Sequence, residues 1–234
     1  MLQDLNKKKT LLRWYSQNID GLESKVGFEM DSNFSISKKC IPLHGSLHFM
    51  QCTACKSTHL FQNYHHDLAA GHFPICHLCK EQEDKRSAAG HRYRMPGQLR
   101  PDIVLYGEQH RQGEGIANAY KKDLTLDLLL VVGTSLKVPG TANLIKEFSK
   151  KIHSNHLPNS IYIDITTPSK KWQEVFDVFI EGDCQIFAKT LRQSMVTSSS
   201  MIFQPQYNED NMNLESYLED IEARQDFRPS WRWL

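Results

Sequence analysis

Two pairs of cysteines constrain this chain more than any other feature of its sequence. Each pair has the spacing C-x-x-C, and 20 residues separate the first pair, Cys52 and Cys55, from the second, Cys76 and Cys79. Four thiolates at this spacing can close a tetrahedron around one zinc ion. Because sulfur would fill all four positions, no place remains for water or a substrate. We therefore expect one structural Zn²⁺ that holds the fold and does not catalyse.

Two disulfides, or four unrelated core thiols, are the alternatives to a zinc site. The sequence opens without an apolar signal segment, and no run approaches the roughly 18 apolar residues of a membrane span. We therefore expect a reducing intracellular compartment, in which disulfides are rare. His59, His72 and His77 lie in or beside the cysteine module and could replace a thiolate, although four paired cysteines make this unnecessary. Cys40 and Cys184 have no such partner and are expected to be small buried residues.

Length and charge exclude few classes of protein. A chain of 234 residues can bury a core and can hold one domain, or a domain with a small module. Its formal net charge of +1 excludes a strong overall attraction to nucleic acid or to a membrane. The local basic clusters at 7–9 and 146–151 are expected to be solvated faces. Neither direct nucleic-acid binding nor membrane association is therefore expected.

The second half of the chain has the alternating pattern of an α/β fold. The continuous apolar run 128–132 predicts a strand that is buried on both faces of a parallel sheet, and a helical pattern follows from Pro139 to about Ile152. Further strands are expected at 160–165 and 99–106. Since ligands of such sheets bind at the carboxyl ends of the strands, the loops there become the candidate site. Gly113-Glu114-Gly115 follows no strand, so we reject it as a phosphate-binding loop.

Several motifs lie in order around the cysteine pairs, and together they resemble the sirtuin family of NAD-dependent protein deacylases. The segment 15–22, YSQNIDGL, resembles the family's signature for nicotinamide and ribose contacts, in which threonine is commoner than Ser16. His44-Gly45 resembles the catalytic histidine, and the cysteines follow it in the family's order. The segment 99–108, LRPDIVLYGE, is similar to the one that holds the acetyl-lysine peptide.

The last motifs of the resemblance lie in the α/β region. Residues 133–135 resemble the family's cofactor loop, and Gly182-Asp183-Cys184 resembles its closing adenine contact. Asp164 stands where the family usually has asparagine. The resemblance spans about residues 11–191 and is strongest to the fungal nuclear sirtuins that act on a histone lysine. It implies an α/β fold, a partial Rossmann-like parallel sheet with a small inserted zinc-binding module.

The resemblance also implies a role for each site residue. His44 would be the general base that takes a proton from a ribose hydroxyl, which suits an imidazole of ordinary pKa about 6.5. Asn18, also catalytic, would orient ribose or water, and Asp20 would accept hydrogen bonds from the nicotinamide amide. The implied cofactor contacts are Gln17, Asn18, Asp20, Gly133, Thr134, Ser135, Asp164 and Cys184, and the implied peptide contacts are Val104, Leu105, Tyr106 and Gly107.

The implied function is NAD⁺-dependent deacetylation of lysine in a histone or another protein, with nicotinamide and O-acetyl-ADP-ribose as products. The partner would be an acetyl-lysine peptide, edge-paired with the strand that ends near Tyr106. The implied setting is the nucleus, with the cytoplasm as a second location, and the implied roles are chromatin silencing and transcription regulation.

Sirtuins begin with a strand, a glycine-rich turn and a helix that receives the cofactor phosphates, whereas this chain starts after these elements. Residues 1–12 are expected to end a helix that feeds a strand at 17–20. We therefore expect a truncated gene model or a degenerate copy, with an incomplete NAD⁺ site. The alternative function is a catalytically silent, zinc-stabilised peptide- or protein-binding module.

The sequence predicts four divisions of the chain. They are a partial cofactor-binding region with the catalytic loop (1–50), the zinc module (51–95), the remainder of the Rossmann-like domain (96–195) and a flexible tail (196–234).

Overall fold

A computed structural model describes residues 1–29, 38–155 and 159–197. The chain divides into two compact units. The first unit comprises residues 1–12 and the chain from Leu124 onward, and the second comprises residues 13–123. Nearly all of the expected tail, 196–234, lies outside the described residues. Within the described ranges, no helix combines the length and apolar character that crossing a membrane requires.

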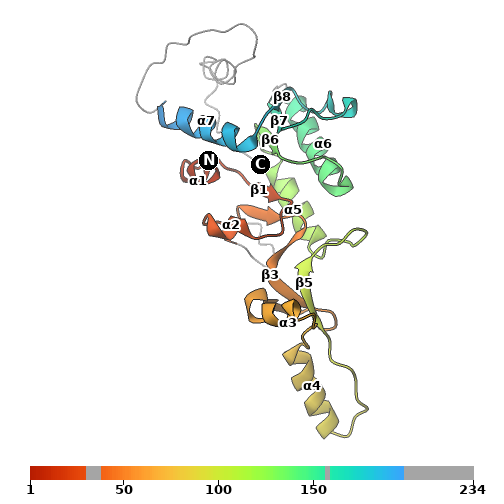
Figure 1. Ribbon diagram of the computed structural model, residues 1–234. Coiled ribbons are helices and arrows are strands. Elements are labelled where there is room, and N and C mark those ends of the chain that lie inside the picture. The colour runs from red at the N-terminus through yellow and green to blue at the C-terminus, as the bar shows by residue number, and fades with distance from the viewer. Residues whose placement is uncertain (30–37, 156–158, 198–234) are drawn as a thin grey trace. The chain divides into compact units, whose positions relative to one another are not determined.

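The first unit is built on a three-stranded parallel sheet, which confirms the predicted α/β class. Its strands are β6 (Leu129–Val132), β7 (Ser160–Asp164) and β8 (Val178–Glu181), in the order β6-β7-β8. Helices α6 (Pro139–Ser154) and α7 (Cys184–Thr197) lie on opposite sides of this sheet (Figure 1). The unit also contains α1 (Leu2–Lys7) and a short 3₁₀ helix, η2 (Lys170–Trp172).

The core of the first unit follows from the sequence pattern. Helix α6 covers the predicted range, and Ile145, Phe148 and Ile152 recur on it at helical spacing and are buried. Pro139 occupies the first turn of α6, where its missing N–H costs nothing. The neighbouring rings of Trp172 and Phe176 are both buried and stack with centroids 5.7 Å apart. Apolar burial between α6 and the sheet therefore holds the strand ends in place.

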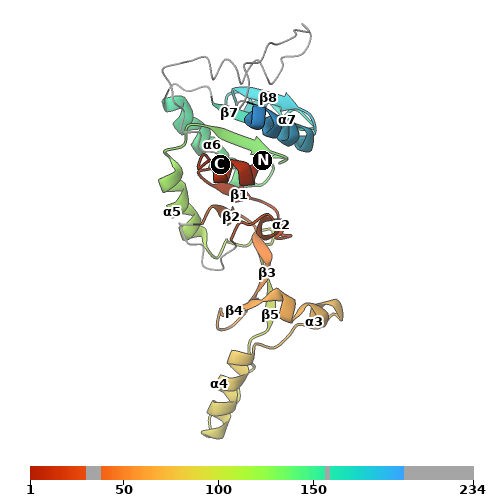
Figure 2. The same ribbon diagram turned by 90° about the vertical axis from the view of Figure 1, so that its left-hand side faces the viewer.

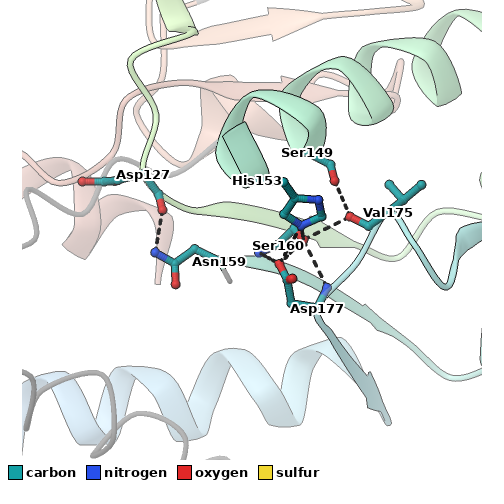
Figure 3. A network of polar contacts seen from close by, with 7 residues as sticks. All are labelled: Asp127, Ser149, His153, Asn159, Ser160, Val175 and Asp177. Carbon is teal, nitrogen blue, oxygen red and sulfur yellow. Dashed lines mark hydrogen bonds and ion pairs between the residues drawn. The ribbon is translucent and has the colours of Figure 1, made fainter. Parts of the chain in front are cut away.

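A polar network joins α6 to the amino-terminal ends of β7 and β8 (Figure 3). Ser160 Oγ donates to Asp177 Oδ2, and His153 Nε2 lies 3.1 Å from the same carboxylate oxygen. The grouping contains a serine, a histidine and an aspartate, but the serine is fully buried and its hydroxyl proton is bound by the carboxylate. It also lies at the opposite end of the strands from their ligand-binding ends. We assign this network to the fold.

The second unit contains two small sheets. Strand β1 (Trp14–Ser16) pairs parallel with β2 (Cys40–Pro42), while β3 (Gly45–Cys52) pairs antiparallel with both β4 (Thr58–Leu60) and β5 (Leu99–Ile103). Helices α3 (His65–Ala69) and α4 (His77–Ala88) lie near β4 and β5, away from β1 and β2 (Figure 2). The helical elements of this unit are α2 (Leu22–Lys25), η1 (Phe61–Asn63), α3 (His65–Ala69), α4 (His77–Ala88) and α5 (Gly113–Asp123).

Two predicted strands were wrong in extent or placement. The strand predicted at 99–106 ends at Ile103 and pairs with β3, so it is no part of the parallel sheet. The residues after Ile103 do not continue the pairing with β3, because the amide of Leu105 donates to the Glu108 carboxylate and the chain turns there. The strand predicted at 17–20 is a loop, because β1 ends at Ser16 and the chain turns at Gly21 with φ +69°.

A buried ion pair closes the second unit on itself. Asp123, the last residue of α5, binds Arg13 Nε at 2.5 Å, and the Tyr15 hydroxyl donates to the same carboxylate at 2.7 Å. Arg13 and Asp123 are both buried. Burial and the neighbouring carboxylate raise the pKa of Tyr15 well above its ordinary range, so this hydroxyl remains a donor. The network fastens the end of α5 to β1.

Candidate active site and zinc site

The four paired cysteines meet in one cluster. Their sulfur atoms all lie within 4.8 Å of one another, with Cys52 to Cys79 at 3.6 Å and Cys55 to Cys76 at 3.8 Å. Tetrahedral zinc with Zn–S bonds of about 2.3 Å needs sulfurs about 3.8 Å apart, whereas a disulfide needs about 2.05 Å. The arrangement therefore fits zinc, as predicted, and does not fit the alternative of two disulfides.

Local structure explains why these sulfurs converge. Cys52 ends β3, and the turn that follows brings the amide of Cys55 within 3.4 Å of the Cys52 sulfur. Cys76 is the cap residue of α4 and Cys79 lies in its first turn. Gly97 passes so close that an added Cβ would lie 2.5 Å from the Cys52 sulfur, so only glycine fits there.

The thiols have different environments. Burial raises the pKa of Cys52 to about 12, so this sulfur needs a nearby cation to become a thiolate. A hydrogen bond with the Ser57 hydroxyl lowers the pKa of the exposed Cys55 to about 6. Outside the cluster, Cys40 is buried, as predicted, and burial raises its pKa to about 12. Cys184 is half-buried.

His44 lies in the turn between β2 and β3 and is held by the backbone of the segment that resembles the nicotinamide signature. Its Nδ1 lies 3.0 Å from the carbonyl oxygen of Gln17. Since a carbonyl can only accept, this contact assigns the proton to Nδ1 and leaves the lone pair on Nε2. The ring is half-buried. The geometry thus presents an imidazole nitrogen that can take a proton.

The loop that carries Asn18 and Asp20 is fixed from both sides. The amide of Leu47, on β3, donates to the carbonyl of Ile19 at 2.8 Å, and the Asp20 carboxylate accepts from the amide of Leu22 at 3.2 Å. The side chains of Asn18 and Asp20 are exposed. Because the backbone is held while these polar groups stay accessible, the loop is suited to contact a ligand.

His48 supports this same loop, a role that the sequence analysis missed. Its Nε2 lies 3.1 Å from the carbonyl oxygen of Gly21 and 2.8 Å from Ser24 Oγ. A Cβ added at Gly21 would lie 2.5 Å from that nitrogen, so the histidine packs tightly against the turn. The position of His48, four residues after His44, gave no separate signal.

The expected peptide contacts follow β5 and adjoin His44. The amide of Val104 donates to the carbonyl of His44 at 2.9 Å. Leu105 and Tyr106 are exposed, Tyr106 completely. The turn is completed by Gly107, at φ +81°.

A carboxylate holds this turn closed. Glu108 accepts from Arg100 at 2.7 Å and from the amide of Leu105 at 3.0 Å. These hydrogen bonds lower the pKa of Glu108 to about 2. Sequence reasoning missed the roles of Arg100 and Glu108, although both lie inside the motif that it singled out.

The remaining cofactor candidates lie in the first unit, at the carboxyl ends of its parallel strands. The amide of Gly133 donates to the carbonyl of Ile163, and the amide of Gly182 donates to the carbonyl of Asp164, each at 2.9 Å. These two bonds bring three strand ends to one edge of the sheet. The candidates gathered there are Gly133, Thr134 and Ser135 after β6, Asp164 at the end of β7, and Cys184 at the start of α7.

The structure thus assembles the predicted residues into three groups. The second unit holds the four cysteines as one group and the signature loop, His44 and the turn after β5 as another. The first unit holds the strand-end residues. The strand-end group lies at the carboxyl ends of β6, β7 and β8, where ligands of α/β sheets generally bind. The cysteine module is separate from this group in sequence and in fold.

Comparisons with known proteins identify the family. The Sir2 family profile matches residues 1–140. The chain is 34% identical over 199 residues to the NAD-dependent histone deacetylase HST4 of Saccharomyces cerevisiae, covering 79% of this chain and 53% of that protein. It is 36% identical over 197 residues to the NAD-dependent protein deacetylase hst4 of Schizosaccharomyces pombe, covering 82% and 47%. The chain belongs to the Sir2 family, the sirtuins.

The solved structures agree on the fold. A structure described as Sir2-p53 peptide-NAD+ has a TM-score of 0.62 at 21% identity, and the match covers 84% of this chain and 68% of that one. The chain spans about half the length of the curated relatives it matches.

Proposed function

We propose that this chain supplies the general base, the nicotinamide loop and the peptide-binding turn of an NAD⁺-dependent protein-lysine deacetylase. One observation carries the proposal. His44 accepts a hydrogen bond from Val104 through its carbonyl and binds Gln17 through its ring, so one residue joins both loops. A base placed between a cofactor loop and a substrate turn is what a reaction between two bound molecules requires.

His44 and its neighbours have complementary roles. NAD⁺, when bound, supplies the ribose carbon that accepts the acetyl oxygen, with nicotinamide as the leaving group. His44 Nε2 takes the proton of a ribose hydroxyl, while Asn18 orients the ribose or a water molecule. Asp20 accepts hydrogen bonds from the carboxamide of nicotinamide. Gln17 completes this group by fixing the tautomer of His44, and the strand-end residues of β6–β8 contact the rest of the dinucleotide.

The substrate in this proposal is an acetyl-lysine segment of a histone or another protein. Its extended backbone pairs with the exposed turn of Val104, Leu105, Tyr106 and Gly107, which offers main-chain groups and an aromatic side chain. Nicotinamide and O-acetyl-ADP-ribose are the products. The names of the fungal relatives, which describe histone deacetylases, support a nuclear site of action, chromatin silencing and transcription regulation. We also propose that the chain has four functional parts, residues 1–50, 51–95, 96–195 and 196–234. The structure itself divides into two compact units.

Nicotinamide release from NAD⁺ in the presence of an acetylated histone peptide tests the function. The assay should use the 234-residue chain and a second protein extended by any in-frame codons that precede Met1. Turnover that requires both NAD⁺ and the acetyl group is the expected result for the extended protein. If neither protein turns over but both bind the peptide, the alternative of a silent, zinc-stabilised binding module replaces the proposal.

A further inference from the structure

A serine and a histidine lie beside the zinc-binding sulfurs without being zinc ligands. Ser57 Oγ is 3.0 Å from the sulfur of Cys55 and 3.5 Å from that of Cys76. His59 Nε2 is 2.8 Å from Ser57 Oγ and 3.7 Å from the Cys76 sulfur. Ser57 directly precedes β4 and His59 lies within it. Residues two apart in an extended segment point the same way, so both side chains face the cluster.

The chemistry of the partners fixes the direction of these hydrogen bonds. A zinc-bound thiolate carries no hydrogen and can only accept. The single hydroxyl proton of Ser57 therefore points to its nearer sulfur, Cys55. Ser57 then accepts at its oxygen, and His59 must be the donor, with its proton on Nε2. The three groups form a chain from imidazole N–H to hydroxyl to thiolate.

Neighbouring rings hold His59 in this orientation. Tyr64 packs edge-on against it at a centroid distance of 6.0 Å, and His77 does so at 5.0 Å. The Tyr64 hydroxyl also lies 3.4 Å from Nδ1 of His77. His59 and Ser57 are both partly buried, so water competes less for their hydrogen bonds than it would at the surface.

Ser57 contacts Cys55, the most exposed of the four paired cysteines. Cys55 is exposed, whereas Cys52 and Cys76 are buried and Cys79 is half-buried. A competing chelator or proton therefore reaches the sulfur of Cys55 first. Hydrogen bonds to a metal-bound ligand stabilise its charged form and orient it. A hydrogen bond donated to the Cys55 thiolate thus strengthens the ligand that would otherwise dissociate from zinc first.

We propose that Ser57 and His59 are positioning residues that slow the release of zinc by holding Cys55 in its ligating geometry. The proposal concerns metal retention and is independent of the proposed deacetylase function.

Zinc release tests this proposal on the full 234-residue chain. Zinc-loaded proteins are mixed with excess 4-(2-pyridylazo)resorcinol, and the coloured zinc complex is followed over time. Ser57→Ala and His59→Gln should each release zinc about 10-fold faster or more, since loss of an outer-shell partner commonly costs 10–100-fold in affinity. Ser57→Thr keeps the hydroxyl and should restore a rate near that of the unchanged protein.

Matched controls in the same module separate this effect from general loosening. Ser87→Ala removes a hydroxyl that binds Glu83 at 3.3 Å, and His72→Gln changes an exposed histidine. Both should leave the rate unchanged. Release rates for Ser57→Ala and His59→Gln that match the unchanged protein would overturn the proposal, as would a fast rate for Ser57→Thr.

A measurement on the unchanged protein covers the case in which the variants do not fold. Long-range ¹H–¹⁵N NMR of the zinc-loaded chain reports which ring nitrogen of each histidine carries the proton. The hydrogen-bond chain requires His59 to be protonated at Nε2. A neutral His59 protonated only at Nδ1 cannot donate to Ser57, and that result would overturn the proposal.

Discussion

Side chains that take no part in the proposed reaction hold the loops of the candidate active site in place. The loop proposed to contact nicotinamide is supported by His48, which contacts Gly21 and Ser24. The turn proposed to bind the peptide is held by Glu108, which joins Arg100 to the amide of Leu105. Each of these residues fixes the backbone of a loop that carries candidate ligand contacts. Its loss should therefore change ligand binding more than the chemical step.

Glu108→Gln should weaken peptide binding while leaving the zinc content unchanged. The amide side chain cannot accept from Arg100 as a carboxylate does, so the turn of 104–107 loses its brace. We expect the KM for an acetylated peptide to rise about 3–10-fold with little change in kcat. Glu114→Gln, an exposed change at the start of α5, is the control, and an equal rise there would contradict the assignment.

The pKa of Glu108 gives the same turn a defined response to pH. A lowered folded pKa means that the brace is complete above the ordinary pKa of about 4.3 and is lost only as pH falls toward 2. The amide NMR shift of Leu105 should therefore stay constant between about pH 6 and pH 4. A titration of this shift centred near the ordinary pKa of about 4.3 would show that Arg100 does not hold the carboxylate.

At the scale of helices and strands, the second unit depends on one buried carboxylate. Asp123→Asn would leave Arg13 buried without its counter-charge, which commonly costs about 3–5 kcal/mol. Chemical denaturation followed by tryptophan fluorescence should show this loss, because Trp14 lies beside Arg13 in the sequence. Asp84→Asn, on the exposed face of α4, should change the free energy of unfolding little. Equal stability of the two variants would contradict a role for the ion pair.

The zinc module gives a second prediction at this scale. Its small core consists of Met50, Cys52, Cys76 and Leu99, so two of the four fully buried residues are also predicted zinc ligands. Cys52→Ala should remove the metal and unfold residues 51–95, since structural zinc contributes on the order of 10 kcal/mol in small modules. Metal analysis and limited proteolysis can measure both effects. Full zinc occupancy in the variant would rule out the four-cysteine ligand set.

Elements with strong periodicity were predictable from sequence, and elements made by tertiary contacts were not. The apolar run of β6 and the helical spacing of α6 depend on local pattern, and both were found close to their predicted places. The run 99–106 also reads as one strand, yet Val104 leaves the ladder for the carbonyl of His44. Spacing predicted the cysteine cluster because a tetrahedron constrains it directly. It could not predict the roles of Ser57 and His59, whose contacts depend on how the chain turns after Cys52, or that of His48, whose partners Gly21 and Ser24 are distant in sequence.

At the scale of the whole molecule, the residues of the proposed function are divided between two units. The second unit holds the proposed base, the proposed nicotinamide loop, the proposed peptide-binding turn and the cysteine module, while the first holds cofactor-contact candidates at the ends of β6, β7 and β8. In the proposal, the first set acts on the reacting end of NAD⁺ and the second contacts the remainder. Within the second unit, His44 and the four paired cysteines form separate groups, so zinc retention and turnover should respond to different substitutions.

The effect of His44→Ala on NAD⁺-dependent nicotinamide release tests the central claim most directly. The measurement should use whichever protein turns over, the 234-residue chain or its upstream extension, with zinc content recorded for each variant. We predict a loss of about 10²–10⁴-fold in turnover, the usual contribution of a general base, with one zinc still bound. Turnover within about threefold of the unchanged protein, at equal zinc content, would contradict the account, since a base commonly contributes far more.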